Sequence, residues 1–399
     1  MAIAKKIADF KSQSSWIRKM FEDGIRLKNL YGAENVFDFS LGNPNLDPPE
    51  KFKKLLIETA HDEKAGVHGY MPNAGLPETR EAIASFLNMK QEVNLAWQYI
   101  VMTCGAGGAL NVVFKTLLDP GDEVVIPTPF FVEYRFYVDN FNAVPKLVRV
   151  KKDFSLDIGA IQSAINEKTK IILINSPNNP TGKVYDHESI EALSSMLVKI
   201  EKKTGRSIYI VSDEPYREIV YDGKTVPSIL KAYRNSIIAT SYSKSISVPG
   251  ERIGYIAVNP GASDSDEIID GLSLCTRILG FVNAPAMMQR IITGLQGVQV
   301  NIGEYQRKRD LLCEGLACIG YEVEKPEGAF YLFLKSPLKN DIDFVKALQE
   351  KNILTVPGSG FEGPGYIRLA YCVDDSTIIN SMNGFEEVFK KHANTCATV

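Results

Sequence analysis

Short and almost fully apolar segments recur between residues 99 and 258, and helical patterns lie between several of them. Segments that are apolar on both faces are typical of strands in a sheet that is covered on both sides, and intervening helices favour parallel crossovers. The clearest such helix is expected over residues 189–203, where apolar residues recur at helical spacing. The chain therefore predicts an α/β body with a mostly parallel sheet. Its expected strands are residues 99–103, 124–126, 170–175, 207–212, 237–240 and 255–258.

The pattern changes after residue 285. Strand-like residues 329–334 and 366–371 mix there with helical residues 342–350 and 376–392, which indicates a smaller α+β domain. The N-terminal segment contains a helical stretch and ends in a turn, and we expect it to pack beside this smaller domain. The predicted division has three parts: residues 1–45 as an N-terminal arm and part of the small domain, residues 46–285 as the large domain, and residues 286–399 as the small C-terminal domain.

Charge and composition exclude several classes of protein. The 399 residues carry 45 Lys and Arg against 48 Asp and Glu, which disfavours a strongly basic nucleic-acid-binding protein and an acidic disordered chain. The four histidines are scattered and give no metal-ligand cluster. The longest uncharged run, residues 94–114, contains two asparagines and three glycines, and fits a strand, loop and helix better than a membrane span. We expect no metal, no nucleic-acid partner and no membrane association.

The cysteines and the N-terminus bear on the cellular location. Six cysteines occur without a Cys-x-x-Cys pair, far below the density of a disulfide-rich secreted domain. Residues 1–11 alternate charged and apolar residues and contain no hydrophobic signal core. We therefore expect a cytoplasmic protein with free thiols.

The loop after residues 99–103 is built from small residues. Parallel sheets bind ligands beyond the carboxyl ends of their strands, so each such loop is a candidate site. Residues 104–109 read Cys-Gly-Ala-Gly-Gly-Ala and open a helix, where backbone N–H groups and the helix dipole favour an anion. Leu110 stands where a dinucleotide-binding motif would need glycine, so one phosphate is favoured over a pyrophosphate. A tight turn without a ligand is the alternative.

The loops after the next two strands offer groups for a planar ring. Phe131 follows residues 124–126 and can stack on a ring, although two adjacent phenylalanines are also common in a core. Asn179 lies in a turn-forming segment after residues 170–175, and its amide can donate to a phenolic oxygen. A turn without a ligand is the alternative for this segment also.

The last two loops carry ionisable residues. Asp213 follows residues 207–212 and can either cap a helix or hold a proton on a ligand nitrogen. Lys244 follows residues 237–240 in a serine-rich loop. Such a lysine is commonly solvated, but a desolvated lysine can act as a Schiff-base nucleophile. Arg252, eight residues further on, offers a second cation for a phosphate.

Each of these features is weak alone, but the set has one common explanation. A phosphate loop, a stacking aromatic, a donor to a phenolic oxygen, a carboxylate for a ring nitrogen, a Schiff-base lysine and a second phosphate cation are together what pyridoxal 5′-phosphate requires. The sequence therefore predicts this cofactor.

The order and spacing of these motifs resemble the aspartate aminotransferase superfamily, the class I/II aminotransferases of fold type I. The resemblance runs from Gly42 to Arg368 and is carried by Ser-Tyr-Ser-Lys at 241–244, Gly-Glu-Arg-Ile-Gly at 250–254 and Asn-Asn-Pro-Thr-Gly at 178–182. It implies a large domain with a mostly parallel seven-stranded sheet between helices, and a smaller α+β domain. It also implies an aminotransferase that moves the amino group of an L-amino acid to a 2-oxo acid by a ping-pong cycle.

The resemblance also implies individual roles. Lys244 would be the Schiff-base lysine and proton shuttle, Asp213 would pair with the ring nitrogen, and Tyr216 with Asn179 would bind the phenolic oxygen. Arg368 would bind the substrate carboxylate, with help from Gly42 and Asn179. The remaining implied contacts to the cofactor are Phe131 on the ring and, around the phosphate, Gly105, Ala106, Gly107, Ser241, Ser243, Arg252 and Tyr70, the last reaching the site of the neighbouring subunit in a homodimer.

The sequence departs from the family pattern in three places. Phe131 replaces the common tryptophan or tyrosine at the stacking position, and the phosphate loop lacks the Ser, Thr or Lys side chain that is often found there. No arginine clearly matches the one that reads a dicarboxylate, although Arg277 lies near that region and could equally be a solvated helix residue. The aromatic and apolar residues of segment 130–141 mildly favour neutral or aromatic donors over aspartate.

Three alternatives remain open from sequence. The same scaffold supports carbon–sulfur β-lyases, because a fold does not fix a reaction. An aminotransferase-like transcription regulator is disfavoured, since the roughly 45 residues before the fold body are too few for a winged helix and a linker. A cofactor-free α/β protein would not explain why six features that suit pyridoxal 5′-phosphate occur together in one sequence.

Overall fold

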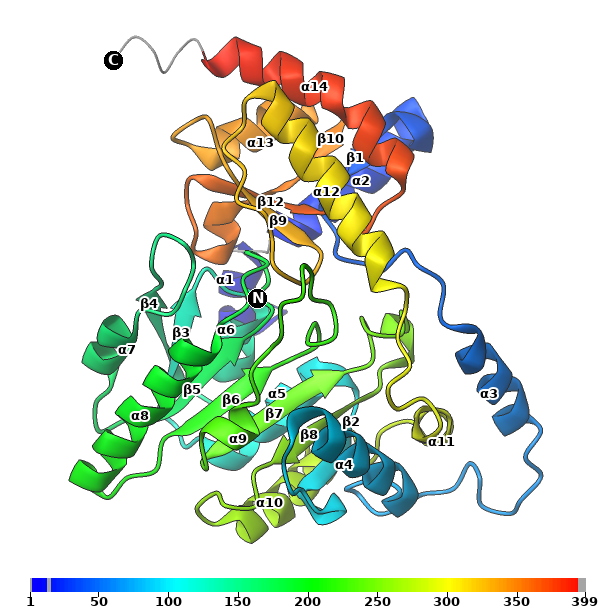
Figure 1. Cartoon of the computed structure of the whole chain (residues 1–399), viewed down its shortest axis with the longest axis vertical. Coiled ribbons are helices and arrows are strands. Elements are labelled where there is room, and N and C mark those ends of the chain that lie inside the picture. The colour runs from blue at the N-terminus through cyan, green and yellow to red at the C-terminus, as the bar shows by residue number, and fades with distance from the viewer. Residues whose placement is uncertain (1, 13–15, 394–399) are drawn as a thin grey trace.

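The computed structural model describes residues 2–12 and 16–393; Cys396, one of the six cysteines discussed above, lies outside them. Two bodies are stacked along the long axis of the molecule (Figure 1). The lower body holds the large sheet, and the upper body holds the C-terminal helices. None of the described helices combines the length and the apolar character that a membrane crossing needs.

The lower body is organised around a seven-stranded sheet with the order β2-β8-β7-β6-β5-β3-β4. The strand β8 runs antiparallel to both of its neighbours, and the other neighbouring pairs are parallel. The predicted α/β fold with a mostly parallel sheet is thus confirmed. The strands are β2 (Ile100–Thr103), β3 (Glu123–Thr128), β4 (Val144–Arg149), β5 (Thr169–Asn175), β6 (Tyr209–Asp213), β7 (Ser236–Ser241) and β8 (Gly254–Val258).

Alternate side chains of these strands enter two separate cores, which explains their unbroken apolar sequences. In β3, Val124 and Ile126 join the core on one face, and Val125 joins the core on the other. One face is covered by α5 (Gly105–Leu117), α6 (Glu133–Asp139) and α10 (Ser265–Ile278). The opposite face is covered by α3 (Glu50–Ala60), α4 (Pro77–Gln91), α7 (Ile158–Ala164), α8 (His187–Thr204), α9 (Ile229–Ala232) and α11 (Ala286–Thr293).

The upper body packs around a second core, to which Phe154, Tyr216, Ile219 and Tyr221 of the lower body also contribute. Its three-stranded antiparallel sheet has the order β11-β12-β9, and β1 of the N-terminal segment pairs in parallel with β10. The strands are β1 (Phe37–Asp38), β9 (Tyr331–Lys335), β10 (Ile353–Leu354), β11 (Val356–Pro357) and β12 (Tyr366–Ala370). The helices are α2 (Trp16–Tyr31), α12 (Ile302–Ile319), α13 (Asp341–Gln349) and α14 (Asp375–Ala393).

The N-terminal helix α1 (Lys5–Ser12) lies between the two bodies. It contacts α6 of the lower body, where Lys6 Nζ lies 2.7 Å from Asp139 Oδ2 and the rings of Phe10 and Phe136 are 4.9 Å apart. The division at residues 45 and 285 stays a prediction, and α11, just past 285, packs on the large sheet. Four short 3-10 helices complete the described elements: η1 (Ala33–Asn35), η2 (Trp97–Tyr99), η3 (Pro249–Glu251) and η4 (Gly358–Phe361).

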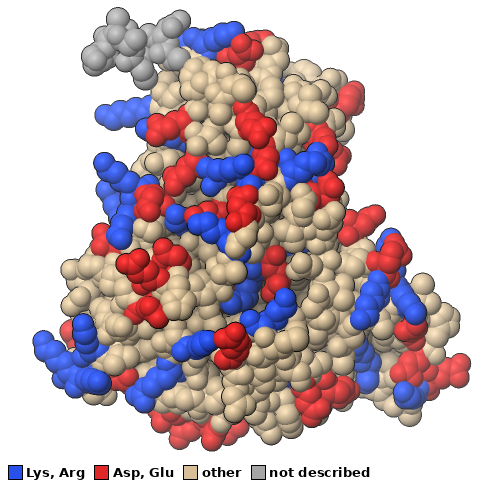
Figure 2. All heavy atoms as spheres, viewed as in Figure 1, with Lys and Arg blue, Asp and Glu red and all other residues tan. Residues whose placement is uncertain are grey.

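Positive and negative side chains are interspersed over the face seen in Figure 2. This mixture agrees with the formal net charge of −3. The face therefore presents no broad surface of one sign.

Candidate active site

A cavity of about 290 Å³ opens where the carboxyl ends of the large-sheet strands meet the upper body. Asn175, Asp213 and Ser241 end β5, β6 and β7, and all three line it. The upper body contributes Tyr331 of β9 and Arg368 of β12. The cavity thus lies at the edge where open parallel sheets bind ligands.

Asp213 presents a buried carboxylate to this cavity. Its Oδ2 accepts a hydrogen bond from Tyr134 Oη at 2.5 Å, whereas its Oδ1 is buried and has no partner among the described residues. Burial raises the pKa of Asp213 to about 7; the Tyr134 hydrogen bond opposes this rise and Glu214 adds to it. An unpaired buried acceptor is costly, so the position favours a ligand that donates a proton to Oδ1.

Lys244 places a partly buried amine in the same cavity. Its Nζ donates to the carbonyl oxygen of Gly42 at 2.9 Å. Burial lowers the pKa of Lys244 to about 8; Cys372 opposes this effect, while Arg252 and Arg368 add to it. The amine can therefore lose its proton near neutral pH, which a lysine nucleophile requires.

Arg368 is a buried cation without an acidic partner among the described side chains. Its Nη1 donates to Asn179 Oδ1 at 3.0 Å and its Nη2 to the carbonyl oxygen of Ser40 at 2.6 Å, but its Nε has no partner. The rings of Tyr331 and Phe361 lie 4.6 and 4.7 Å from its guanidinium carbon. A buried and incompletely paired guanidinium is suited to bind a carboxylate.

The first turn of α5 and Arg252 form the cationic end of the cavity. Gly105 has a φ of +74°, and a Cβ there would lie 2.9 Å from Arg252 Nη2, so only glycine lets the guanidinium approach this closely. Ala106 and Gly107 line the cavity at the helix N-terminus, where the macrodipole favours an anion.

Of the other predicted residues, Phe131, Asn179, Tyr216, Ser241, Ser243 and Gly42 also line the cavity. The hydroxyls of Tyr216 and Tyr331 lie 2.8 Å apart. Two predicted residues lie elsewhere in this chain: Tyr70 is 93% exposed, and Arg277 is exposed on α10.

Sequence reasoning gave no individual role to four polar residues that line this cavity: Tyr134, Tyr137, Asn175 and Tyr331. Asn175 Nδ2 donates to the carbonyl oxygen of Asp213, and Asn175 Oδ1 accepts from the N–H of Asn179. An asparagine that ends an otherwise apolar strand was a usable signal for it. The three tyrosines gave no such signal, because they stand in segments that read equally well as core.

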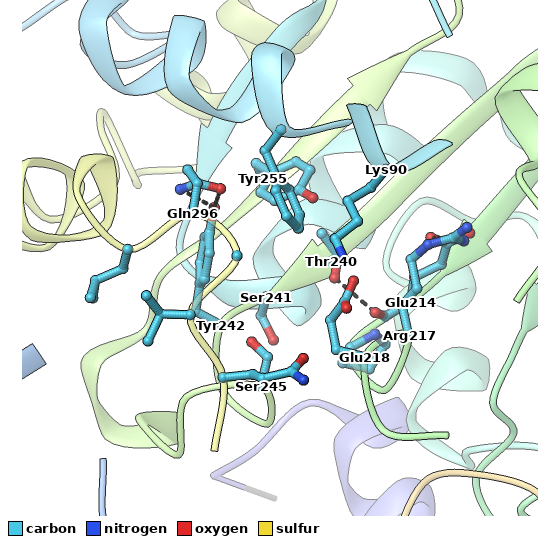
Figure 3. A pocket seen from close by; sticks show the side chains of 16 residues that line it. Lys90, Glu214, Arg217, Glu218, Thr240, Ser241, Tyr242, Ser245, Tyr255 and Gln296 are labelled. Carbon is cyan, nitrogen blue, oxygen red and sulfur yellow. Dashed lines mark hydrogen bonds and ion pairs between the residues drawn. The ribbon is translucent and has the colours of Figure 1, made fainter. Parts of the chain in front are cut away.

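A smaller cavity of about 100 Å³ is lined by Ser241, Tyr242 and Ser245, which lie close to Lys244 in the chain (Figure 3). It shares Ser241 and Pro215 with the first cavity. In its wall, Thr240 Oγ1 donates to the carbonyl oxygen of Glu214 at 2.9 Å, and the Glu214 carboxylate accepts from Arg217 Nη1 at 2.9 Å. The bond from Thr240 to Glu214 joins the chain segments that carry Ser241 and Asp213. The wall of the smaller cavity therefore helps to hold two lining residues of the first cavity in place.

The residues present fit pyridoxal 5′-phosphate. The unpaired Asp213 Oδ1 matches a protonated ring nitrogen, the lysine of lowered pKa matches an aldehyde, and the glycine-lined helix end with Arg252 matches a phosphate. A fold with a mostly parallel sheet and this site at its carboxyl edge defines a pyridoxal-phosphate enzyme of fold type I.

Comparison with known proteins identifies the family. The family model for aminotransferase class I and II matches residues 34–383. A probable aspartate aminotransferase of Methanocaldococcus jannaschii is 35% identical over 393 residues, covering 94% of this chain and all of the relative. A probable aspartate/prephenate aminotransferase of Aquifex aeolicus is 33% identical over 371 residues. The alignment covers 90% of this chain and 92% of that relative.

A solved structure agrees with this. An amino transferase from Eubacterium rectale is 40% identical and superposes with a TM-score of 0.95. The superposition covers 98% of this chain and 99% of the solved chain. The chain belongs to the class I and II aminotransferases. It is a pyridoxal-phosphate-dependent amino-acid aminotransferase, and the carbon–sulfur lyase alternative is not favoured.

Proposed function

We propose that the cavity residues divide the work of transamination as follows. When bound, pyridoxal phosphate supplies an electron-accepting ring that stabilises negative charge at the substrate Cα. The Asp213 carboxylate holds the proton on the ring nitrogen and so maintains that capacity. The amine of Lys244 would take the proton from the substrate Cα and return it on the cofactor side of the substrate nitrogen. General acid–base transfer of this kind is typically worth ~10²–10⁴-fold in rate.

The other roles concern binding and orientation. Arg368 binds the α-carboxylate of the substrate with two parallel hydrogen bonds, and Gly42 and Asn179 support it at the same end of the cavity. Tyr216 and Asn179 hold the phenolic oxygen of the cofactor, and Phe131 stacks on its ring. Gly105, Ala106, Gly107, Ser241, Ser243 and Arg252 surround its phosphate. The support for this assignment is that these side chains, Gly105 excepted, line one cavity, while Gly105 packs against Arg252.

The substrate is proposed to be an amino acid with a neutral or aromatic side chain, paired with a 2-oxo acid. The observation that carries this proposal is the charge of the cavity wall: its described cations are Lys244, Arg252 and Arg368, and each already has a role above. Leu41, Leu110 and Phe131 add apolar surface to this wall. The second candidate is aspartate, the donor that appears in the names of both relatives.

A donor screen separates the two candidates. The enzyme is mixed with single amino acids without an oxo acid, and the change of the cofactor absorption is followed for the first half-reaction. We expect phenylalanine, tyrosine and other neutral donors to react faster than aspartate, and the variant Arg277→Ala to match the wild type. Fast reaction with aspartate that is lost selectively in Arg277→Ala would overturn the proposal in favour of a dicarboxylate donor.

We also propose a homodimer in the cytoplasm. Tyr70 is almost fully exposed and does not line the cavity of its own chain, as expected of a side chain that completes the site of a second copy. The five described cysteines are all unpaired, which suits a reducing compartment. Full activity of monomers at nanomolar dilution would contradict the shared site.

A further inference from the structure

The phosphate end of the cavity contains a hydroxyl that no assignment above uses. The loop at residues 105–109 carries only Gly and Ala, so it can offer backbone N–H groups but no side-chain donor. A Cβ added at Gly107 would lie 3.1 Å from Tyr137 Oη. The Tyr137 hydroxyl therefore occupies the space that a side chain at position 107 would take.

The Tyr137 hydroxyl is free to bind a ligand. It makes no hydrogen bond with any described residue, and Tyr137 lines the cavity together with Ala106, Gly107 and Arg252. Burial, followed by the carboxylates of Glu133 and Asp213, raises the pKa of Tyr137 to about 12, against an opposing effect of Arg252. The phenol therefore keeps its proton at neutral pH and can donate it to an anion.

Two asparagines fix the helix that carries Tyr137 against the loop. Asn111 Nδ2 donates to the carbonyl oxygen of Gly107 at 2.9 Å, and Asn140 Nδ2 donates to Asn111 Oδ1 at 2.9 Å. Asn140 follows α6 directly, so this chain of bonds links the C-terminal end of α6 to the first turn of α5. The position of the hydroxyl beside Gly107 is thus held from both helices.

We propose that Tyr137 is a ligand of the cofactor phosphate, donating from its hydroxyl at the place where the Gly/Ala loop lacks a side chain. The inference rests on the proposed placement of the phosphate at the first turn of α5. Gly107 and Tyr137 then form a matched pair, in which the small residue leaves room for the phenol of the larger one.

Cofactor affinity tests this proposal. The holoenzyme is stripped of cofactor and titrated with pyridoxal phosphate and, separately, with pyridoxal, which lacks the phosphate. In Tyr137→Phe we expect the dissociation constant for pyridoxal phosphate to rise about 10-fold, or ~1.4 kcal/mol. The affinity for pyridoxal should not change. Tyr209→Phe serves as the matched control, because it also removes one tyrosine hydroxyl. That hydroxyl donates to the carbonyl oxygen of Ser263, and neither residue lines the cavity, so both affinities should stay unchanged.

A second variant asks whether the hydroxyl can be supplied from the loop. In Gly107→Ser combined with Tyr137→Phe, the serine has the room that the phenol hydroxyl vacated, and we expect affinity for pyridoxal phosphate to recover several-fold over Tyr137→Phe alone. Three results would overturn the inference: unchanged affinity in Tyr137→Phe, an equal loss for pyridoxal and pyridoxal phosphate, or an effect confined to the KM of the amino acid. A wild-type chain that takes up no pyridoxal phosphate would instead overturn the proposed function.

Discussion

Replacing Asp213 by asparagine should stabilise the cofactor-free protein while abolishing catalysis. Burial raises the pKa of Asp213 from 3.8 to about 7, so the folded state holds this proton more tightly than the unfolded chain does. The stability contribution of the group is complete below about pH 4 and is lost as the pH rises through about 7. At ~1.4 kcal/mol per pKa unit, the ionised carboxylate costs the cofactor-free protein about 4 kcal/mol at pH 8.

Urea unfolding of the cofactor-free proteins between pH 4 and pH 8 measures this effect. Asparagine keeps an oxygen that can accept from Tyr134 and carries no charge. The variant should therefore match the wild type near pH 4, exceed it increasingly up to about pH 7, and exceed it by a constant amount from there to pH 8. The exposed Asp270 of α10 offers a matched Asp→Asn control that should follow the wild type. A difference that does not depend on pH, or a variant that is less stable at pH 8, would refute the reasoning.

Three further predictions concern the same cavity. Arg368→Lys cannot reproduce two parallel hydrogen bonds to a carboxylate, so we expect steady-state kinetics to show a KM for the amino acid higher by roughly 10–100-fold; an unchanged KM would argue against this role. Gly42→Ala places a Cβ 2.0 Å from Tyr331 Oη and 2.6 Å from its ring carbon Cζ, so kcat/KM should fall markedly, and the second change Tyr331→Phe, which keeps the ring, should restore little of it. Because burial lowers the pKa of Lys244 to about 8, the rate at which stripped enzyme recaptures pyridoxal phosphate should rise with pH up to about 8 and then level off.

The sequence predicted those parts of the fold that rest on local pattern. Strands β5 and β7 are apolar on both faces and were recognised because helices cover both sides of the sheet. Strand β4 was missed: it lies at the sheet edge, is only partly buried, and contains a proline and two basic residues within Val144–Arg149. The sequence pattern also did not resolve helices α11 and α12 as two elements, and residues 294–301 separate them.

Some residues of the candidate site could likewise be predicted from local sequence pattern, and others could not. Asp213 and Lys244 were found because they follow strands that local pattern reveals, and parallel strands bring their carboxyl ends to one edge. Tyr331 reaches that edge from β9 of the other body, more than a hundred residues from Tyr216, whose hydroxyl it contacts. Tyr134 and Tyr137 belong to a short helix whose orientation depends on packing against α5. No pattern within a short stretch of sequence encodes such contacts.

The most direct measurement is the identity of the lysine that binds the cofactor covalently. Borohydride reduction of the holoenzyme fixes the bond between the cofactor aldehyde carbon and a lysine nitrogen, and peptide mapping by mass spectrometry then locates it. We expect the pyridoxyl group on Lys244 alone, and none on the same peptide of Lys244→Ala. A label on a different lysine, or no label on the wild type, would contradict the central claim.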